Sequence, residues 1–341
     1  MINKSSTAVV LLQLGGPDGP EAVKPFLYNL FCDPDIIDLP GAFLFRKLLA
    51  RMISTFRSPK VIELYKHIGG KSPILEQTNL QAHALRKFLK VRGHDFRVYV
   101  AMRYWHPFTD ETVDEVIKEG INRLILVPLY PHYSKSTTGS SYNELKRVLK
   151  KRKMDNKIEL KLIHSHPDNP DYIQAMVERI HEALQRFPLD TRENVQLVFS
   201  AHGTPMTLVR QGDPYSHHIR ITYEAAVKQG GFRQPTTLCF QSKVGPQKWL
   251  EPSLIDTIDR LGKEGIKQML VIPIAFVSEH LETLSEIGIE GKKQAMDLGV
   301  EQFEVMPALL DHPLYIKCLG DLVIEKLDIK EAESLKIKAE S

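Results

Sequence analysis

An internal repeat is the feature of this sequence that most constrains its fold. The tetrapeptide KEGI occurs at residues 118–121 and again at 263–266. Each copy is followed by an apolar run ending in a proline, Pro128 in the first copy and Pro273 in the second. Three further pairs of similar segments occur in a consistent order and contain Pro17 and Pro205, Pro107 and Pro246, and Pro170 and Pro313. One pair could arise by chance, but four pairs in the same order indicate a duplicated fold.

The repeat predicts an α/β protein made of two Rossmann-like domains. In each half, short apolar runs alternate with segments of helical periodicity, a pattern typical of four βα units around a parallel sheet. We expect each domain to be a four-stranded parallel sheet flanked by helices, with right-handed crossovers. The expected helices cover residues 79–91, 110–119, 140–152, 171–186, 252–264 and 313–327.

The domain boundaries follow from a change in composition. Proline and charged residues gather between 186 and 195, so the junction is placed there. This gives an N-terminal domain over residues 1–186 and a C-terminal domain over 195–327. Residues 328–341 are charged and poor in apolar side chains, so we expect a frayed tail.

Composition excludes several classes of protein. The 341 residues, 43% apolar and 26% charged, are those of a soluble globular protein of two domains. A net charge of +3 is too small to indicate nucleic-acid binding. No window approaches about 18 uninterrupted apolar residues, and the apolar run near the start lacks a cleavage signature, so neither a membrane span nor a signal peptide is expected. Three widely separated cysteines without a CxxC motif favour a reducing cytoplasm.

Residues 268–287 carry the strongest local signal for a functional site. The apolar run 269–277 is typical of a strand buried on both faces, and Ser278 is a good N-cap from which a helix is expected to begin. The end of such a strand is where α/β sheets present ligand groups. Three carboxylates would share one face of the predicted helix: Glu279, Glu282 and Glu286. Alternatively, acids in a first helical turn simply complement the helix dipole.

Comparison of the two halves separates these explanations. The three glutamates align with hydroxyl side chains in the first half, Ser134, Thr137 and Ser141, and His202 aligns with Leu14. A residue type that the fold required should recur in both halves. His202, Glu279 and Glu282 are therefore interpreted as site residues.

His202 follows an apolar strand over residues 195–199 and precedes Gly203, which places its imidazole at the carboxyl edge of the predicted sheet. Histidine with carboxylates can bind a borderline cation such as Fe²⁺ or Zn²⁺, or carry protons near neutral pH. A histidine bonded within its own loop is the alternative. The chain has no G-x-S-x-G elbow and no phosphate-binding glycine motif after a strand, so hydrolase and nucleotide sites are not indicated.

Aromatic and basic residues are expected to line the remainder of the site. As a group they would suit a large, flat, apolar ligand that carries anionic groups. They are Tyr28, Phe31, Arg103, Tyr104, Trp105, Tyr130, Tyr133 and Trp249.

Two segments carry a specific resemblance to a known family. Residues 199–215, FSAHGTPMTLVRQGDPY, and 276–287, FVSEHLETLSEI, resemble the signature blocks of ferrochelatases, with their essential residues at His202 and Glu282. Further blocks with the same resemblance are LLQLGGPDGPEAVKPFLYNLFCDPDII, IGGKSPI, RYWHP, LYPHYSKSTTGSS and QSKVGPQKWLEP. The resemblance implies the chelatase-like fold of two Rossmann-like halves. It also implies a lyase that inserts Fe²⁺ into a porphyrin with release of two protons, the last step of haem biosynthesis.

The resemblance assigns roles to individual positions. His202 and Glu282 would be catalytic and would contact the metal, and Arg103 and Tyr130 would lie on the opposite wall and bind or pass the metal. The porphyrin-binding positions would be Arg103, Tyr104, Tyr130, Ser242, Trp249, Glu279, His280 and Glu286. Iron is a substrate in this reaction, and no other cofactor is implied. Lys135 stands where cluster-containing relatives have a cysteine ligand, so no iron–sulfur cluster is expected.

The resemblance also sets expectations about partners. These are a porphyrin and ferrous iron, without nucleic acid, and a monomer is favoured over a dimer. The apolar and basic segment 39–57 would form a lip over the porphyrin entrance. We expect a cytoplasmic protein with at most weak peripheral contact with the inner face of the plasma membrane.

Three alternatives stay open at this point. Protoporphyrin IX is favoured because the first block reads QLGGPDGP and lacks the tyrosine of coproporphyrin-dependent relatives, but coproporphyrin III is the nearest alternative. Another class II chelatase, inserting cobalt into a less oxidised tetrapyrrole, would have a shorter chain. A tetrapyrrole-binding protein without chelatase activity is the alternative from a different functional class.

Overall fold

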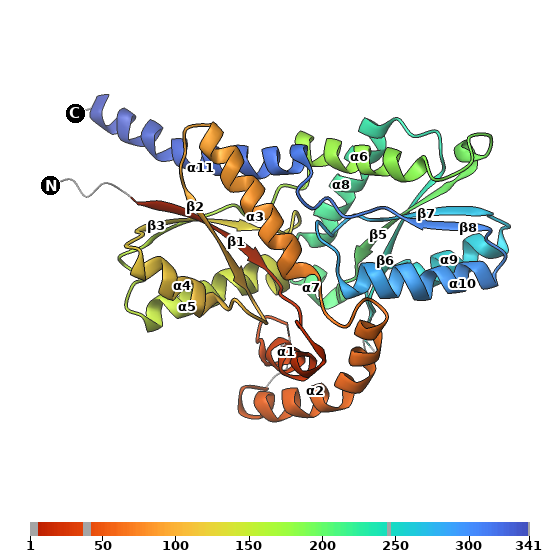
Figure 1. Cartoon of the computed structure of the whole chain (residues 1–341), viewed down its shortest axis with the longest axis horizontal. Coiled ribbons are helices and arrows are strands. Elements are labelled where there is room, and N and C mark those ends of the chain that lie inside the picture. The colour runs from red at the N-terminus through yellow and green to blue at the C-terminus, as the bar shows by residue number, and fades with distance from the viewer. Residues whose placement is uncertain (1–5, 37–41, 244–246, 340–341) are drawn as a thin grey trace.

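Two parallel sheets with the same strand order form the framework of the molecule (Figure 1). The computed structural model describes residues 6–36, 42–243 and 247–339. The first sheet has the order β2-β1-β3-β4 and the second β6-β5-β7-β8, with every neighbouring pair parallel. The strands are β1 (Thr7–Gln13), β2 (Arg97–Met102), β3 (Arg123–Pro128), β4 (Glu159–Leu162), β5 (Gln196–His202), β6 (Thr236–Gln241), β7 (Gln268–Pro273) and β8 (Gln302–Val305). The predicted fold class is confirmed.

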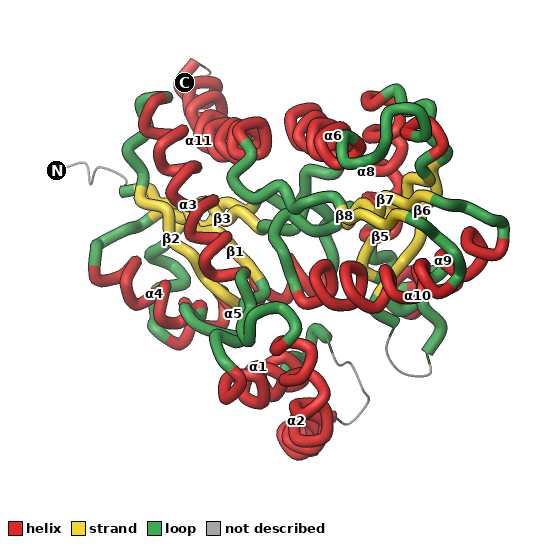
Figure 2. The backbone as a smooth tube through the Cα atoms, turned by 45° about the vertical axis from the view of Figure 1, so that its right-hand side comes forward, coloured by secondary structure: helices red, strands yellow, loops and turns green. Residues whose placement is uncertain are grey.

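The central strands are apolar on both faces because helices cover both sides of each sheet (Figure 2). In β1, Val9 and Leu11 pack into one core and Val10 and Leu12 into another. This alternation is the period-two geometry of a strand. Each such fully buried side chain contributes about 1.5–3 kcal/mol relative to an exposed one.

Helices connect the strands in both halves. The first half has α1 (Pro20–Cys32), α2 (Ala42–Lys66), α3 (Ile74–Val91), α4 (Thr109–Lys118), α5 (Ser140–Lys151) and α6 (Pro170–Leu184). The second has α7 (Met206–Arg210), α8 (Tyr215–Gly230), α9 (Leu254–Lys263), α10 (Lys292–Asp297) and α11 (Pro313–Ala339), and a short 3₁₀ turn, η2 (Arg192–Asn194), joins the halves. All six expected helices are present; five lie within five residues of their predicted bounds, and the sixth, α11, continues beyond its predicted end at residue 327. Helices α1, α7, α8 and α10 were not among the six. A π-helical segment follows the third strand in both halves: η1 (Lys135–Gly139) and η3 (Glu282–Gly291).

The last helix of each half covers the sheet of the other half. Helix α6 packs on β7 and α8, whereas α11 packs on α3 and β3 (Figure 1). One apolar core consequently contains residues of both sheets and of both exchanged helices. The packing of the helices therefore crosses the predicted domain junction near residue 186. The position of that junction in the sequence stays a prediction.

The last helix and the predicted lip differ in extent from the segments expected in the sequence. Helix α11 continues to residue 339, beyond the end of the helix predicted over 313–327. The charged, frayed tail expected over residues 328–341 stays a prediction. The lysine, glutamate, leucine and alanine content of this stretch favours helix over coil. The predicted lip 39–57 lies on α2 from residue 42 onward, and its first three residues lie outside the described part of the chain.

A buried group of histidines and tyrosines lies where the exchanged helices meet. His166 is 3% exposed and packs at ring-centroid distances of 5.6 Å from Tyr172 and 6.3 Å from Tyr315. Burial lowers the pKa of His166 to about 4. Nearby His132 is also buried, and burial, with repulsion from His166 and His218, lowers its pKa well below the ordinary value. Both imidazoles are therefore neutral at physiological pH.

Acid should destabilise the protein through His166. Because the folded pKa lies below the unfolded value of about 6.5, this contribution is complete above pH 6.5 and is lost as the pH falls toward 4. The expected loss from this residue is about 3 kcal/mol. Urea unfolding of His166→Phe near neutral pH and near about pH 4.5 should show a smaller acid-induced loss than wild type. The exposed His181→Gln is the control, and an unchanged loss in His166→Phe would contradict the assignment.

Candidate active site

His202 is the last residue of β5, at the carboxyl edge of the second sheet, where the sequence predicts it. Its side chain is half-buried, and its ring lies 6.4 Å from the ring of Phe276. The next residue must be glycine, since a Cβ at Gly203 would lie 2.8 Å from the carbonyl oxygen of Gln241 and 3.3 Å from the ring of Trp249. The strand end and the Trp249 loop are thus packed directly against each other.

The helix that carries the acids begins later than predicted. Ser278 does not cap it; the helix is π-type and starts at Glu282. The Ser278 side chain is fully buried, and its hydroxyl lies 3.4 Å from Oε1 of Gln81 on α3, so it is used in a contact with the other half instead. π-Helical segments are rare and are frequently found at functional sites.

Glu279 does not share a face with the other two glutamates, so that part of the prediction is wrong. It precedes the helix, and both of its carboxylate oxygens are bound within the protein. Oε1 accepts a hydrogen bond from the Ala308 N–H (2.8 Å), and Oε2 accepts one from the Thr283 hydroxyl (2.6 Å). In the structure this carboxylate ties the start of η3 to the loop after β8.

His202, His280, Glu282 and Glu286 form one electrostatic group, named here the His202 site. Burial lowers the pKa of His280, the charges of Glu282 and Glu279 raise it, and repulsion from His202 lowers it. Burial raises the pKa of Glu286, and repulsion from Glu282 adds to that rise. Hydrogen bonds from Ser242 and the charge of His202 act in the opposite direction. The charges of these four side chains are therefore coupled, which places them in one part of the structure.

Ser242 holds Glu286 in place. Its N–H and its hydroxyl donate to the two carboxylate oxygens of Glu286, at 2.7 and 2.6 Å. Ser242 has φ = 66°, an uncommon conformation for a residue other than glycine and one that occurs often at functional sites. The structure therefore places Ser242 against the acid helix.

In the first half, Arg103 and Tyr104 belong to one buried ionic group. Arg103 Nη2 lies 3.0 Å from the carboxylate of Asp33, and its Nε donates to the Ser140 hydroxyl (2.8 Å). Tyr104 is fully buried and donates its hydroxyl to the same Asp33 (2.5 Å). Tyr104 thus has no free surface for a ligand, and its hydroxyl helps to fix Asp33. Tyr130 is half-buried; burial raises its pKa, and the Ser141 hydroxyl and the charge of Arg103 oppose that rise.

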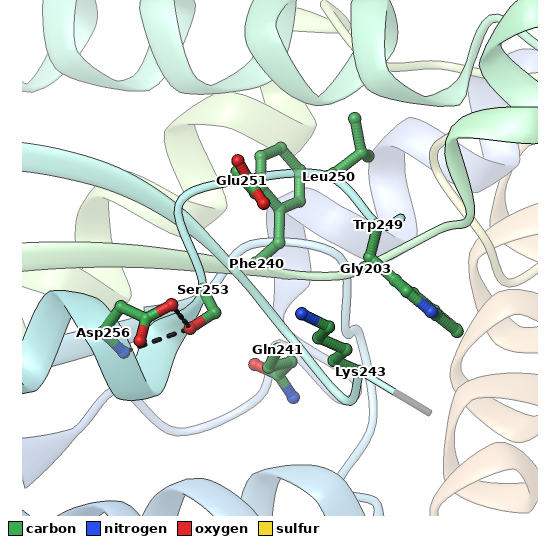
Figure 3. A pocket seen from close by; sticks show the side chains of 9 residues that line it. All are labelled: Gly203, Phe240, Gln241, Lys243, Trp249, Leu250, Glu251, Ser253 and Asp256. Atoms are coloured by element: carbon green, nitrogen blue, oxygen red, sulfur yellow. Dashed lines mark hydrogen bonds between the residues drawn. The ribbon is translucent and has the colours of Figure 1, made fainter. Parts of the chain in front are cut away.

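A small pocket lies beside the strand end that carries His202 (Figure 3). It is lined by Gly203, Gln241, Trp249 and residues of the following loop, and Ser253 and Asp256 are hydrogen-bonded at its far wall. Neither His202 nor Glu282 lines it. In the described part of the chain, no group of three or more His, Cys, Asp or Glu side chains is arranged to hold a metal ion.

Sequence reasoning missed two residues that lie near the segment leading into η3, Tyr65 and Gln81. The charge of Glu282 helps to raise the pKa of the buried Tyr65 of α2, although burial is the larger cause, so this tyrosine lies near the site. Gln81 of α3 contacts residues just before the acid helix. The available signal for Gln81 was its position: a long polar side chain on the helix face that also carries the apolar residues Ile74, Ala82 and Leu85.

Comparison with known proteins agrees with the resemblance. A family model described as Ferrochelatase matches residues 6–327. The chain is 48% identical to the ferrochelatase of Citrifermentans bemidjiense, over 94% of this chain and 98% of that protein. It is 45% identical to the ferrochelatase of Gloeobacter violaceus, over 95% and 99% of the two chains.

Solved structures agree at the level of fold. SirB from Bacillus subtilis with Fe³⁺ aligns with a TM-score of 0.57 at 13% identity, covering 96% of this chain and 98% of that one. The sirohydrochlorin chelatase SirB from Bacillus subtilis subspecies spizizenii in complex with cobalt aligns with a TM-score of 0.54 at 10% identity, covering 96% and 97%. The two-domain arrangement is therefore that of known chelatases.

Proposed function

The chain belongs to the ferrochelatase family, and from this premise we infer that it is a lyase that inserts ferrous iron into protoporphyrin IX to form protohaem, the last step of haem biosynthesis. The family match over residues 6–327 carries this conclusion, because it includes both sheets, His202 and the acid helix. The relatives at 45–48% identity are similar over nearly their whole length, and they favour this function over a binding protein without activity.

The reaction must remove two protons from the pyrrole nitrogens as iron enters. We assign His202 as the group that meets the porphyrin face, where a neutral imidazole can take a proton or bind Fe²⁺. Glu282 would supply the negative charge that stabilises the imidazolium or the entering cation. Glu286, whose pKa is raised by burial, is suited to accept the proton next and release it toward solvent.

The remaining positions would hold the substrates. Trp249 packs on Gly203 beside His202, so its ring is suited to contact the porphyrin plane. Arg103 and Tyr130, from the first half, are assigned to the metal path, and Arg103 alternatively to a propionate. We expect no iron–sulfur cluster: Cys32, Cys239 and Cys318 lie on α1, β6 and α11. Purified protein with the visible absorption of such a cluster would refute this.

One experiment tests the proposed function. Anaerobic Fe²⁺ insertion is measured with protoporphyrin IX and coproporphyrin III side by side, and kcat/KM is expected to be higher for protoporphyrin IX. A higher value for coproporphyrin III would reassign the substrate. Stoichiometric porphyrin binding without insertion would identify a carrier instead of an enzyme.

Helix α2 supports a proposal about peripheral membrane contact. Large apolar side chains are exposed along it at helical spacing, Phe45, Leu48, Met52 and Phe56, the last at 80%. Basic residues lie among them. No helix in the described part of the chain is both long and apolar enough to cross a bilayer. We propose a monomer, to be checked by analytical ultracentrifugation, that binds anionic lipid weakly through this face.

Co-sedimentation with phosphatidylserine vesicles at low salt tests the membrane contact. Wild type should pellet partly and be released by salt, because the basic residues contribute through screened charge. The double variant Leu48→Asp with Phe56→Asp should stay in solution. Val91→Asp, an equally exposed apolar position on α3, is the control and should pellet like wild type. Wild type that does not pellet would remove the proposal.

A further inference from the structure

The segment between β7 and η3 depends on the other half of the molecule for its shape. Residues 274–280, all of them described, form only turns and bends, although they include His280 and lead directly to Glu282. The N–H of Glu279 donates to Gln77 Oε1 on α3, at 2.7 Å. A side chain of the first half thus replaces a backbone partner that regular secondary structure would have supplied.

Gln81, one turn further along α3, makes a denser set of contacts with the same region. Its Nε2 donates to the carbonyl oxygen of Leu310 (3.1 Å) and lies 3.4 Å from that of Val277. Its Oε1 lies 3.4 Å from the Ser278 hydroxyl. The side chain is fully buried, so its loss would leave the Leu310 carbonyl oxygen and the Ser278 hydroxyl without this buried partner.

The contacts of Gln81 join two loops of the second half. Val277 and Ser278 lie before the acid helix, and Leu310 lies in the loop after β8. The Leu310 N–H donates to the Val277 carbonyl oxygen (2.9 Å), and Glu279 bonds to Ala308 in the same loop. Gln81 therefore completes a buried hydrogen-bond network just before η3. None of its hydrogen bonds involves β5, the strand that carries His202.

The repeat provides an independent parallel. In the first half, η1 follows β3 as η3 follows β7, and its start is tied to the second half by Asp213. One carboxylate oxygen of Asp213 accepts hydrogen bonds from the Ser134 hydroxyl (2.9 Å) and the Lys135 N–H (2.8 Å). Both π-helical segments are thus anchored across the boundary between the halves, with different residue types in the two cases.

We propose that Gln81, assisted by Gln77, is a positioning residue that sets the place of Glu282 relative to His202. This inference depends on the proposed function of the His202 site. Because β5 and η3 belong to one half while the anchor belongs to the other, the relative position of the halves determines how His202 and the acids meet. A displacement of about 1 Å between reacting groups can cost a factor of about 100 in rate.

The test uses Gln81→Met, which keeps the size of the side chain and removes its hydrogen bonds. We expect kcat for iron insertion to fall about 10- to 100-fold, while KM for the porphyrin changes by less than about threefold. Hydrogen–deuterium exchange of residues 277–291 should become faster. Gln77→Leu removes only the bond to Glu279 at a half-buried position and should give the same pattern with a smaller loss.

Thr78→Val is the matched control on the same helix. Thr78 is fully buried, and its hydroxyl bonds only to the Ile74 carbonyl oxygen within α3, so the variant loses a buried hydrogen bond without touching the acid segment. The proposal is overturned if Gln81→Met keeps a wild-type kcat and exchange pattern, or if Thr78→Val loses as much kcat. Wild type that inserts no metal would refute the proposed function instead, and the exchange of residues 277–291 would still decide whether Gln81 holds the segment.

Discussion

Replacement of His202 with alanine is expected to lower the rate of iron insertion by about 10²- to 10⁴-fold, the range for loss of a general acid–base group. His202 is the last residue of β5, at the edge of the sheet, and its charge affects the pKa values of His280 and Glu286. His280, the other imidazole of the site, lies in the loop before η3 and cannot take the place of His202 on the strand. The expected cost corresponds to about 3–5 kcal/mol of transition-state stabilisation. The reaction is followed anaerobically by the absorbance of the metalloporphyrin.

Two controls separate chemistry from folding in the His202 variant. Porphyrin binding, measured by fluorescence quenching, should change little, because the predicted porphyrin contacts at Trp249 and Arg103 remain. His217→Ala replaces an exposed histidine on α8 and should keep full activity. A purified His202→Ala protein that inserts iron or zinc at the wild-type rate would show that the central assignment is wrong.

The fold was predictable because its determinants are local and repeated. The apolar runs before Pro128 and Pro273 became β3 and β7, at equivalent places in two sheets of the same topology. Helical periodicity states which face of a helix is apolar, but it does not state which sheet that face covers. For this reason the sequence did not predict that α6 and α11 each cover the sheet of the other half.

The position of the acids was only partly predictable, for a related reason. Spacing placed Glu279 with Glu282 on the assumption that the helix begins at Ser278. In the structure Ser278 is engaged by Gln81 of the other half, and Glu279 by Ala308. These partners are distant in sequence, and the late start of the π-helix follows from such long-range contacts. His202, in contrast, is placed by its own strand, and sequence reasoning located it correctly at the strand end.

Glu282→Gln is expected to lower kcat for iron insertion by about 100-fold, because the variant keeps the shape of the side chain and removes the charge that would stabilise an imidazolium or the entering cation. Repulsion from Glu282 helps to raise the pKa of Glu286, so its removal should lower that pKa. If the carboxylate form of Glu286 accepts the proton, the acidic limb of the pH–rate profile should then move to lower pH.

The same substitution has a matched control on the same helix. Glu290 lies on η3 and is exposed, so Glu290→Gln removes one negative charge without changing the His202 site and should leave both kcat and the acidic limb in place. A limb that moves to higher pH in Glu282→Gln would mean that another group controls it, since loss of a nearby negative charge favours the ionised carboxylate. Full activity in Glu282→Gln would remove Glu282 from the mechanism.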